Sequence, residues 1–342
     1  MAFFGLDIGS YAIKFAKIER GTSPKVARLG AIYNPVGQIL PSDPNQFVQL
    51  SAAIKNGVSD HGLAGMSCHL AVPGLQSYIS IVAMPALSDA ELSSAIKWEA
   101  EQHIPVSLDE VNFEYDVVWR PPKGSTEENM SVFMVGVPKT TVERLLELLR
   151  QAGLEAIGLE PEPVSLNRAF FGKKIKEPPV TTLVCDFGAL STSFVVIEDS
   201  RMVVTHTANM GSLALTRALE RAFSLDPSQA EEYKRTYGLE NNQLEGKVRN
   251  ALLPVFSAVI DEVRKTMQFY ASKYNGMRKV SRIVMVGGGS NLPGMVTYLA
   301  ETLSVEVVVG DPFAGMKTDG KIQLPPDKAS YGVAVGLALK EF

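Results

Sequence analysis

The chain has 342 residues, 46% of them hydrophobic and 20% charged, which is the composition of a globular protein long enough for two domains. A net charge of −4 without a block of basic residues argues against nucleic acid as the main partner. The two cysteines and four histidines form no spaced motif, so neither a disulfide nor a zinc site is expected, and no apolar run approaches the ~20 residues of a membrane span.

The N-terminal segment has a strand–turn–strand pattern. Residues 3–14, FFGLDIGSYAIK, consist of an apolar run, a turn that contains Asp7, Gly9 and Ser10, and a second apolar run. Gly9 supplies the backbone freedom that a tight turn needs. The N–H groups of such a turn can form an anion-binding nest. No signal peptide precedes this segment, so a cytosolic protein is expected.

The remainder of the first 85 residues predicts further strands and one helix. Apolar residues recur at helical spacing at Phe47, Leu50, Ile54 and Val58. The expected elements are strands 13–18 and 26–32, a helix over 46–58, and strands 68–72 and 78–84.

Residues 86–155, called the inserted module below, have the pattern of a small α+β unit. The expected order is a helix from Ser88 or Asp89 to about residue 102, strands 111–119 and 131–137, and a helix over 139–151. Trp98 and Trp119 both fall in this module. They are interpreted as core residues, with a peptide-binding surface as the alternative.

The second half of the chain repeats the strand and turn pattern and then becomes helical. The basic segment 173–179 contains prolines and is the best lobe boundary. The expected elements are strand 156–159, a helix to about 171, strands 192–197 and 202–207, helices 212–223, 227–237 and 243–274 with a break or kink at Pro254, strands 282–286 and 305–309, and a closing helix over 330–342 that carries Gly332 and Gly336.

The first turn has a second copy. Residues 186–198, DFGALSTSFVVIE, align without a gap with residues 7–19, DIGSYAIKFAKIE. The identical pairs are Asp7/Asp186, Gly9/Gly188, Phe15/Phe194, Ile18/Ile197 and Glu19/Glu198. Two similar lobes with such turns facing one cleft would form a clamp for phosphate and a divalent metal. Two unrelated β-hairpins are the alternative.

The order of these parts resembles the superfamily of actin, heat-shock chaperone and sugar-kinase ATPases, over essentially the whole chain. Within it the chain is most similar to the PilM family of pilus assembly proteins, whose well-known relative is the division protein FtsA. The features that carry this resemblance are the inserted module at 86–155, the connector EPVSLNRA at 162–169, the segment QAEEYK at 229–234, and the final YGVAVGLA at 331–338, without the amphipathic tail of FtsA.

This resemblance implies an α/β actin-like ATPase fold, in which two ribonuclease H-like lobes enclose a nucleotide cleft and an FtsA-type α+β subdomain is inserted. The implied subdomains are 1A at 1–85, continued at 156–178 and 327–342; 1C at 86–155; 2A at 179–211 and 281–326; and the helical 2B at 212–280.

The resemblance also assigns a binding site for ATP and Mg²⁺. Asp7 and Asp186 would hold Mg²⁺ through its water shell. The implied nucleotide-binding residues are Gly9, Ser10, Tyr11 and Lys14 in the first turn; Gly188, Ala189 and Thr192 in the second; Gly211, Glu231 and Lys234 near the ribose; and Gly287, Gly288, Gly289 and Ser290 near the adenine and α-phosphate. Gly211 is followed by Ser212 where the family usually has a second glycine.

Three of these assignments have structural alternatives. Glu162 stands where the superfamily often places the residue that orients the attacking water. Glu160 is the other candidate for this role. An acid before a proline can also simply precap a helix. From the sequence alone, a solvated strand lysine is the favoured interpretation of Lys14, and only its position in the motif favours phosphate binding. Glu231 and Lys234, three apart, could be an ordinary ion pair worth ~0.2–0.5 kcal/mol.

The function implied is that of a cytoplasmic, ATP-binding component of the type IV pilus assembly platform at the inner membrane, with a role in twitching motility. It would bind the cytoplasmic N-terminal tail of a PilN-type protein in a groove between the first lobe and residues 86–155, and relay to pilus motor ATPases. Membrane association would then come through the partner.

ATP binding is expected more than rapid turnover. The alternatives are an FtsA-like filament protein and a small-molecule kinase, for which no clear aspartate base is found. The hydrolysis rate, the oligomeric state, and a competence or secretion system in place of a pilus are left open.

Overall fold

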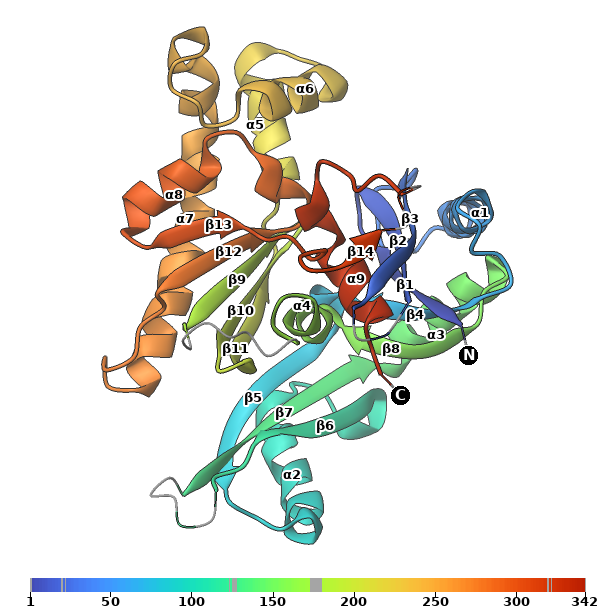
Figure 1. Ribbon diagram of the computed structural model, residues 1–342, viewed down its shortest axis with the longest axis vertical. Coiled ribbons are helices and arrows are strands. Elements are labelled where there is room, and N and C mark those ends of the chain that lie inside the picture. The colour runs from blue at the N-terminus through green and yellow to red at the C-terminus, as the bar shows by residue number, and fades with distance from the viewer. Residues whose placement is uncertain are drawn as a thin grey trace.

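The computed structural model describes residues 2–19, 21, 23–122, 124, 128–172, 180–318, 320 and 322–341. The linker expected at 173–179 lies outside these residues. Two bodies, the first and second lobes, lie side by side, and a third body extends from the junction between them (Figure 1).

The first lobe is built on a six-stranded sheet with the order β14-β3-β2-β1-β4-β8. Its strands are β1 (Phe3–Ile8), β2 (Ala12–Glu19), β3 (Lys25–Tyr33), β4 (Ser67–Val72), β8 (Ala156–Pro161) and the short β14 (Lys317–Thr318). The first three strands form an antiparallel meander, and β4 and β8 then add in parallel on the other side of β1.

The second lobe repeats this topology. Its strands are β9 (Thr182–Phe187), β10 (Thr192–Glu198), β11 (Arg201–Ala208), β12 (Arg282–Val286) and β13 (Glu306–Val309), in the order β11-β10-β9-β12-β13. The strand directions match those of β3-β2-β1-β4-β8. The register matches as well, because Asp7 lies opposite Lys14 and Asp186 lies opposite Ser193. The predicted two-lobed fold is therefore confirmed.

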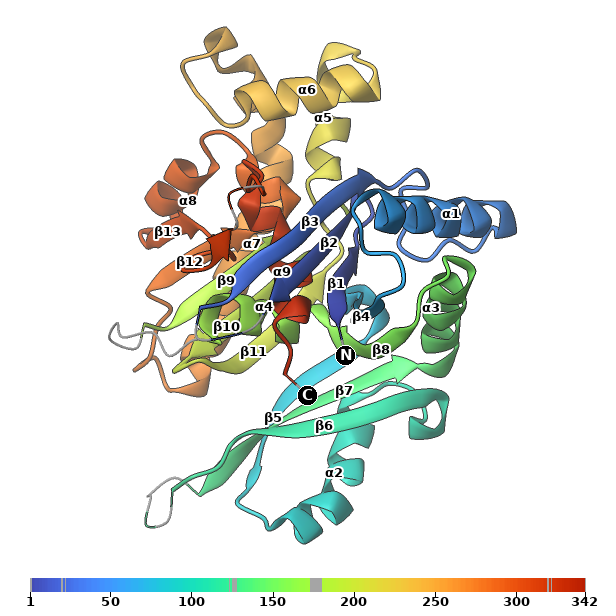
Figure 2. The same cartoon turned by 45° about the vertical axis from the view of Figure 1, so that its right-hand side comes forward.

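Two helices join the lobes. Helices α4 (Glu162–Phe171) and α9 (Gly332–Ala338) pack against each other between the two sheets (Figures 1 and 2). They approach closely because Gly336 has no side chain: a Cβ atom there would lie 1.9 Å from the carbonyl oxygen of Ser165. One core cluster includes Leu166 and Leu337 from these helices together with apolar residues of both sheets. A change in the angle between the lobes must therefore involve the packing of α4 and α9.

The other helices cover the outer faces of the lobes. Helix α1 (Pro44–Asp60) begins with Asp43 as its N-cap and packs against α3 (Lys139–Gln151) on the first lobe. The second lobe carries α5 (Leu213–Phe223), α6 (Pro227–Tyr237), α7 (Lys247–Lys273) and α8 (Met295–Leu303). Of the two expectations at Pro254, the break is wrong, because α7 continues through that residue as one helix, and the kink stays a prediction. No helix in the described ranges is long and apolar enough to cross a membrane.

The third body is a three-stranded sheet, β5-β7-β6, covered by α2 (Asp89–His103). It includes one strand that precedes the expected limit of 86. Strand β5 (Tyr78–Pro85) pairs along its length with β7 (Asn129–Pro138), whose other neighbour is β6 (Val111–Trp119). Helix α3 contacts β6 and β7 of this sheet as well as α1 of the first lobe, and its apolar side lies in a core cluster that the sheet shares with that lobe. The inserted module of the structure therefore consists of β5, α2, β6 and β7, with α3 packed between it and the first lobe.

The two tryptophans of this module are not core residues. Trp98 on α2 is 74% exposed. Trp119, at the end of β6, lies under the guanidinium group of Arg201 on β11, 5.2 Å from it. The module thus contacts the second lobe as well as the first.

Candidate functional site

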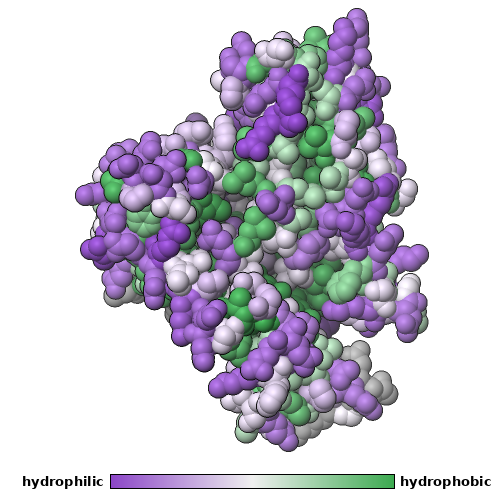
Figure 3. Space-filling view, turned by 180° about the vertical axis from the view of Figure 1, so that it is seen from behind, coloured by the Kyte–Doolittle hydropathy of each residue, from purple (hydrophilic) through white to green (hydrophobic). Residues whose placement is uncertain are grey.

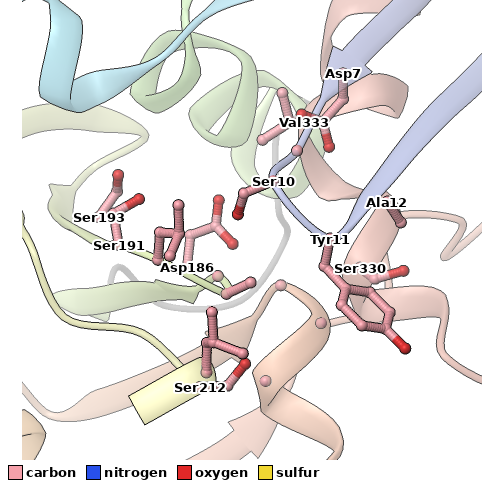
Figure 4. Close-up of a pocket in the computed structure, with 18 of the residues that line it drawn as sticks. Asp7, Ser10, Tyr11, Ala12, Asp186, Ser191, Ser193, Ser212, Ser330 and Val333 are labelled. Carbon is pink, nitrogen blue, oxygen red and sulfur yellow. The ribbon is translucent and has the colours of Figure 1, made fainter. Parts of the chain in front are cut away.

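The two acid-and-glycine turns face one cavity of about 370 Å³ between the lobes. Figure 4 shows Ser10 from the first turn and Asp186 from the second reaching into this space, with Ser330 and Val333 on another wall. The described residues that line it include Asp7, Gly9, Ser10, Tyr11 and Lys14; Asp186, Gly188 and Ala189; Glu162; Glu231 and Lys234; and Gly287, Gly288 and Gly289. The fold thus gathers most of the residues that the sequence singled out.

The floor of the cavity carries more negative than positive charge. Lys14 Nζ lies 3.2 Å from Asp7 Oδ2, on the neighbouring strand. Asp186 has Ser193 opposite it on the paired strand, in the position equivalent to Lys14. Burial and the nearby Asp7 carboxylate raise the pKa of Asp186 to about 6. A divalent cation would neutralise this excess charge.

Glu162 is the first residue of α4 and extends into the same space. Its Oε2 accepts a hydrogen bond from the backbone N–H of Gly74, at 3.1 Å. Burial, with repulsion from Asp186 and Asp7, raises the pKa of Glu162 to about 8. A carboxyl group with such a pKa can accept a proton near neutral pH.

Glu160 has a different role. Its two carboxylate oxygens accept hydrogen bonds from Arg168 at 2.6 and 2.7 Å, and Lys340 lies 3.1 Å away. Burial opposes ionisation, but Arg168 and Lys340 outweigh it and lower the pKa of Glu160. Arg168 also donates to the carbonyl of Gly336. Glu160 therefore ties β8 to α4 and α9, and it does not line the cavity.

The wall of the cavity near α6 contains a buried lysine. Lys234 Nζ lies 2.6 Å from Glu231 Oε2 and donates to Thr216 Oγ1 at 2.8 Å and to the carbonyl of Ser212 at 3.3 Å. Burial lowers the pKa of Lys234, while Glu231 acts in the opposite direction. The pair is held in place by α5 and is more than an exposed surface ion pair. Both side chains still border the cavity, where they could bind a sugar hydroxyl.

The glycine segment after β12 brings its backbone against the second turn. Gly287 has a φ of +81°, and a Cβ atom there would lie 2.3 Å from Asp186 Oδ1. A Cβ atom at Gly288 would meet nothing within 4 Å, so this residue faces open space. These positions leave room for a flat ring or a phosphate beside the backbone.

Three predicted site residues are placed elsewhere. Thr192 is fully buried and donates to the carbonyl of Met210, and Ser290 is buried and donates to that of Gly287. A Cβ atom at Gly211 would lie 2.4 Å from the carbonyl oxygen of Ala189. None of the three is among the cavity-lining residues of the described chain. They shape the second turn and the glycine segment, and the structure gives no support for direct contact with a ligand.

Several lining residues were not predicted. Ser193, Ser212, Asp327 and Ser330 border the cavity, as do Leu75 and Gln76 of the short 3₁₀ helix η1 (Gly74–Gln76). Ser193 could have been found from the repeat, because it takes the place of Lys14 in the second copy. The other positions lie in short 3₁₀ helices or next to helix ends with no distinguishing pattern, and only the folded chain brings them to the site.

The side chains fit a hydrated Mg²⁺ bound together with phosphate. In the described part of the chain, no three His, Cys, Asp or Glu side chains lie close enough to hold a metal ion by themselves. Mg²⁺ commonly keeps several waters and takes one or two carboxylates plus substrate phosphates. Asp7 and Asp186 supply those carboxylates, and the two turns supply N–H groups for phosphate.

The duplicated lobes, the joining helix pair and the central cavity define the class of actin-like proteins. Within that class, the family model described as type IV pilus assembly protein PilM matches residues 5–342. The chain belongs to this family, and its role is in type IV pilus assembly.

The solved structures and curated relatives agree with this placement. The structure titled PilM-PilN type IV pilus biogenesis complex has a TM-score of 0.85 and 26% identity, and covers 99% of this chain and 98% of that chain. MreB5 of Spiroplasma citri bound to ADP has a TM-score of 0.55 and 14% identity, and covers 98% and 94%. Cell division protein FtsA of Streptococcus pneumoniae is 22% identical and covers 89% of this chain and 74% of its own length. The kinase and filament alternatives are not favoured.

Proposed function

We propose that this PilM-family protein binds ATP with Mg²⁺ between its lobes and, on the cytoplasmic side of the inner membrane, binds the short cytoplasmic tail of a PilN-type protein. The observation that carries the nucleotide half is the pair of acid-and-glycine turns facing one cavity, with Asp7 and Asp186 at its floor. The partner half is supported by the similarity to the PilM-PilN complex over 99% of this chain. Relay to motor ATPases remains a prediction.

Within the cavity, each group has a distinct proposed role. Asp7 and Asp186 hold the water shell of Mg²⁺, and Lys14 contacts the phosphates beside Asp7. Glu231 and Lys234 bind the ribose. We assign the orientation of the attacking water to Glu162 in preference to Glu160, because both oxygens of Glu160 are bonded to Arg168.

The nucleotide half is tested with Asp7→Ala. We expect the affinity for Mg²⁺-ATP, measured by isothermal titration calorimetry, to fall about 10- to 100-fold, because one of two carboxylates facing the metal is removed. Asp60→Ala, at the exposed end of α1, is the control and should bind ATP like the unaltered chain. Equal affinity in both variants would exclude the two-turn site.

The inserted module provides an acidic surface for the partner. Among the described residues, β6 pairs only with β7, so its other edge is free for an extended segment. Glu114 and Asp116 of β6 lie opposite Val135 and Phe133, which pack in the core cluster of the first lobe. Directly opposed residues share a face of the sheet. The two exposed acids therefore face the groove next to the first lobe and favour a basic tail.

Figure 3 shows the side of the molecule opposite to that in Figure 1, where the surface is hollowed between the bodies and apolar residues gather in and around the hollow.

Charge reversal tests this half without removing any part of the fold. Deletion of 86–155 would also remove α3, which contributes Leu145, Leu148 and Leu149 to the first-lobe core. A tail peptide of the single-pass protein recovered from membrane extract should bind the double variant Glu114→Lys, Asp116→Lys about tenfold or more weakly, and binding to the unaltered chain should weaken with salt. Glu101→Lys on α2 is the control. If both variants bind alike, the groove lies elsewhere.

A further inference from the structure

The turn that leads into the inserted module is itself part of the cavity wall. Pro73, Leu75 and Gln76 line the cavity, and η1 is followed after one residue by β5. Any ligand that moves this turn therefore moves the start of the strand on which the module is built.

Both lobes contact Gly74 at the start of this turn. From the first lobe, Glu162 accepts the hydrogen bond of the Gly74 N–H. From the second lobe, Thr207 packs so closely that a Cβ atom at Gly74 would lie 2.3 Å from Thr207 Oγ1. Only glycine fits this position without displacement of Thr207.

The contact from the second lobe extends back to the cavity. Thr207 Oγ1 lies 3.0 Å from the hydroxyl of Ser193, and Ser193 lines the cavity next to Asp186 on the paired strand. Gly74 is thus connected to the cavity through Glu162 in the first lobe. In the second lobe it is connected through Thr207 and then Ser193.

Beyond the turn, the module rests on the second lobe. Figures 1 and 2 show β5 beside β11, and residues of the two strands are in contact. At the far end of the module, Trp119 packs under Arg201 of β11. The module is covalently connected to the first lobe and lies against the second, so a change in the angle between the lobes must change one of these contacts.

We propose that η1 couples the nucleotide cavity to the inserted module: a nucleotide that changes the distance between Glu162 and Thr207 shifts β5 and the module along β11. This regulation rests on the proposed function. Coupling is reciprocal: if the nucleotide shifts the module along β11, then a change at the contact of the module with β11 must alter the affinity for the nucleotide.

The two tryptophans provide the measurement, because both lie in the module. In Trp98→Phe, the fluorescence emission comes from Trp119 alone, at the contact with Arg201. We expect Mg²⁺-ATP to shift this emission and to change deuterium exchange of the β5 amides. If calorimetry detects no ATP binding, the proposed function fails and the coupling fails with it. If ATP binds and neither signal changes, only the coupling is overturned.

A matched pair of variants on β11 tests the path. Thr207→Val keeps the shape of the side chain and removes the bond to Ser193, whereas the Thr205 hydroxyl has no hydrogen-bond partner among the described residues. In the Trp98→Phe background, the ATP-dependent shift should persist in Thr205→Val and be lost in Thr207→Val while ATP still binds. An unchanged shift in Thr207→Val would overturn the path through Thr207.

Reciprocity gives a second readout that does not depend on the variants of β11. Trp119→Ala should change the Kd for ATP by about fivefold or more although Trp119 is not a cavity residue. Trp98→Ala, on the exposed side of α2, is the matched control and should leave the Kd unchanged. Equal Kd values in the two variants would overturn the coupling.

Discussion

Glu160 and Glu162 are two residues apart, yet their surroundings give them opposite properties. The oxygens of Glu160 are bonded to Arg168, and its pKa is lowered. Glu162 accepts a hydrogen bond from the Gly74 N–H, and its burial together with two nearby carboxylates raises its pKa to about 8. The difference follows from the end of the strand: Glu160 lies in β8, whereas Glu162 is the first residue of α4, where the chain has changed direction.

This difference predicts how stability depends on pH in the absence of nucleotide. The pKa values of Glu162 and Asp186 are raised to about 8 and about 6 in the folded chain, above the ordinary values of 4.5 and 3.8 for these carboxyl groups. Their protonated forms therefore stabilise the fold at low pH, and this stabilisation is lost as the pH rises through 6 and then 8. We expect the free energy of unfolding to fall by up to about 1.4 kcal/mol per pH unit for each group.

Glu162→Gln should flatten this decline between pH 6 and 8, because a glutamine amide does not titrate. Urea unfolding at pH 5 to 9 measures the effect, and Glu101→Gln on exposed α2 is the control. A slope in Glu162→Gln equal to that of the control would contradict the crowding of carboxylates in the cavity.

At the scale of elements, the α4–α9 pair determines how closely the lobes approach. A Cβ atom at Gly336 would overlap the carbonyl oxygen of Ser165, which belongs to a helix backbone and cannot move aside alone. A Cβ atom at Gly332 would lie 3.0 Å from the Leu166 side chain, which can rotate. The two glycines are four residues apart on one helix and differ in what they meet.

We therefore expect Gly336→Ala to destabilise the protein by about 3 kcal/mol or more, because the helices must separate. In Gly332→Ala the nearest atoms, at 3.0 Å, belong to side chains that need to shift only slightly, so we expect a destabilisation of about 1 kcal/mol. Thermal unfolding followed by circular dichroism compares them. Similar stability of the two variants would show that α4 and α9 do not pack as described.

At the scale of the whole molecule, a ligand between the lobes bridges parts that are otherwise joined by α4, α9 and the inserted module. The cavity is bordered by residues of both sheets and by η1. A ligand that binds only the folded chain stabilises it by mass action. The lobes also repel each other at this place, because Asp7 and Asp186 face the same space.

Mg²⁺-ATP at 100 times its Kd should raise the free energy of unfolding by about 2.7 kcal/mol. ATP in the presence of a chelator should stabilise much less, because the triphosphate then adds negative charge to two carboxylates. Differential scanning calorimetry with and without the chelator measures this. Equal stabilisation in both conditions would argue against the metal role of Asp7 and Asp186.

The sequence by itself determined the two-lobed fold and the two turns that face the cavity. Asp7–Glu19 and Asp186–Glu198 are local strand–turn–strand patterns, and their alignment shows that one unit occurs twice. Lys14 could be placed beside Asp7 because a hairpin register follows from the length of its turn.

Only the tertiary structure decided which residues meet across long separations in the chain. The pairing of β5 with β7, the packing of α3 on the first lobe, and the contact of Trp119 with Arg201 all depend on such contacts. The same holds for Gly74 between Glu162 and Thr207. Periodicity reports which face of an element is apolar, but not which neighbour covers it. The duplicated turns were therefore readable from local pattern, and their connection to the inserted module was not.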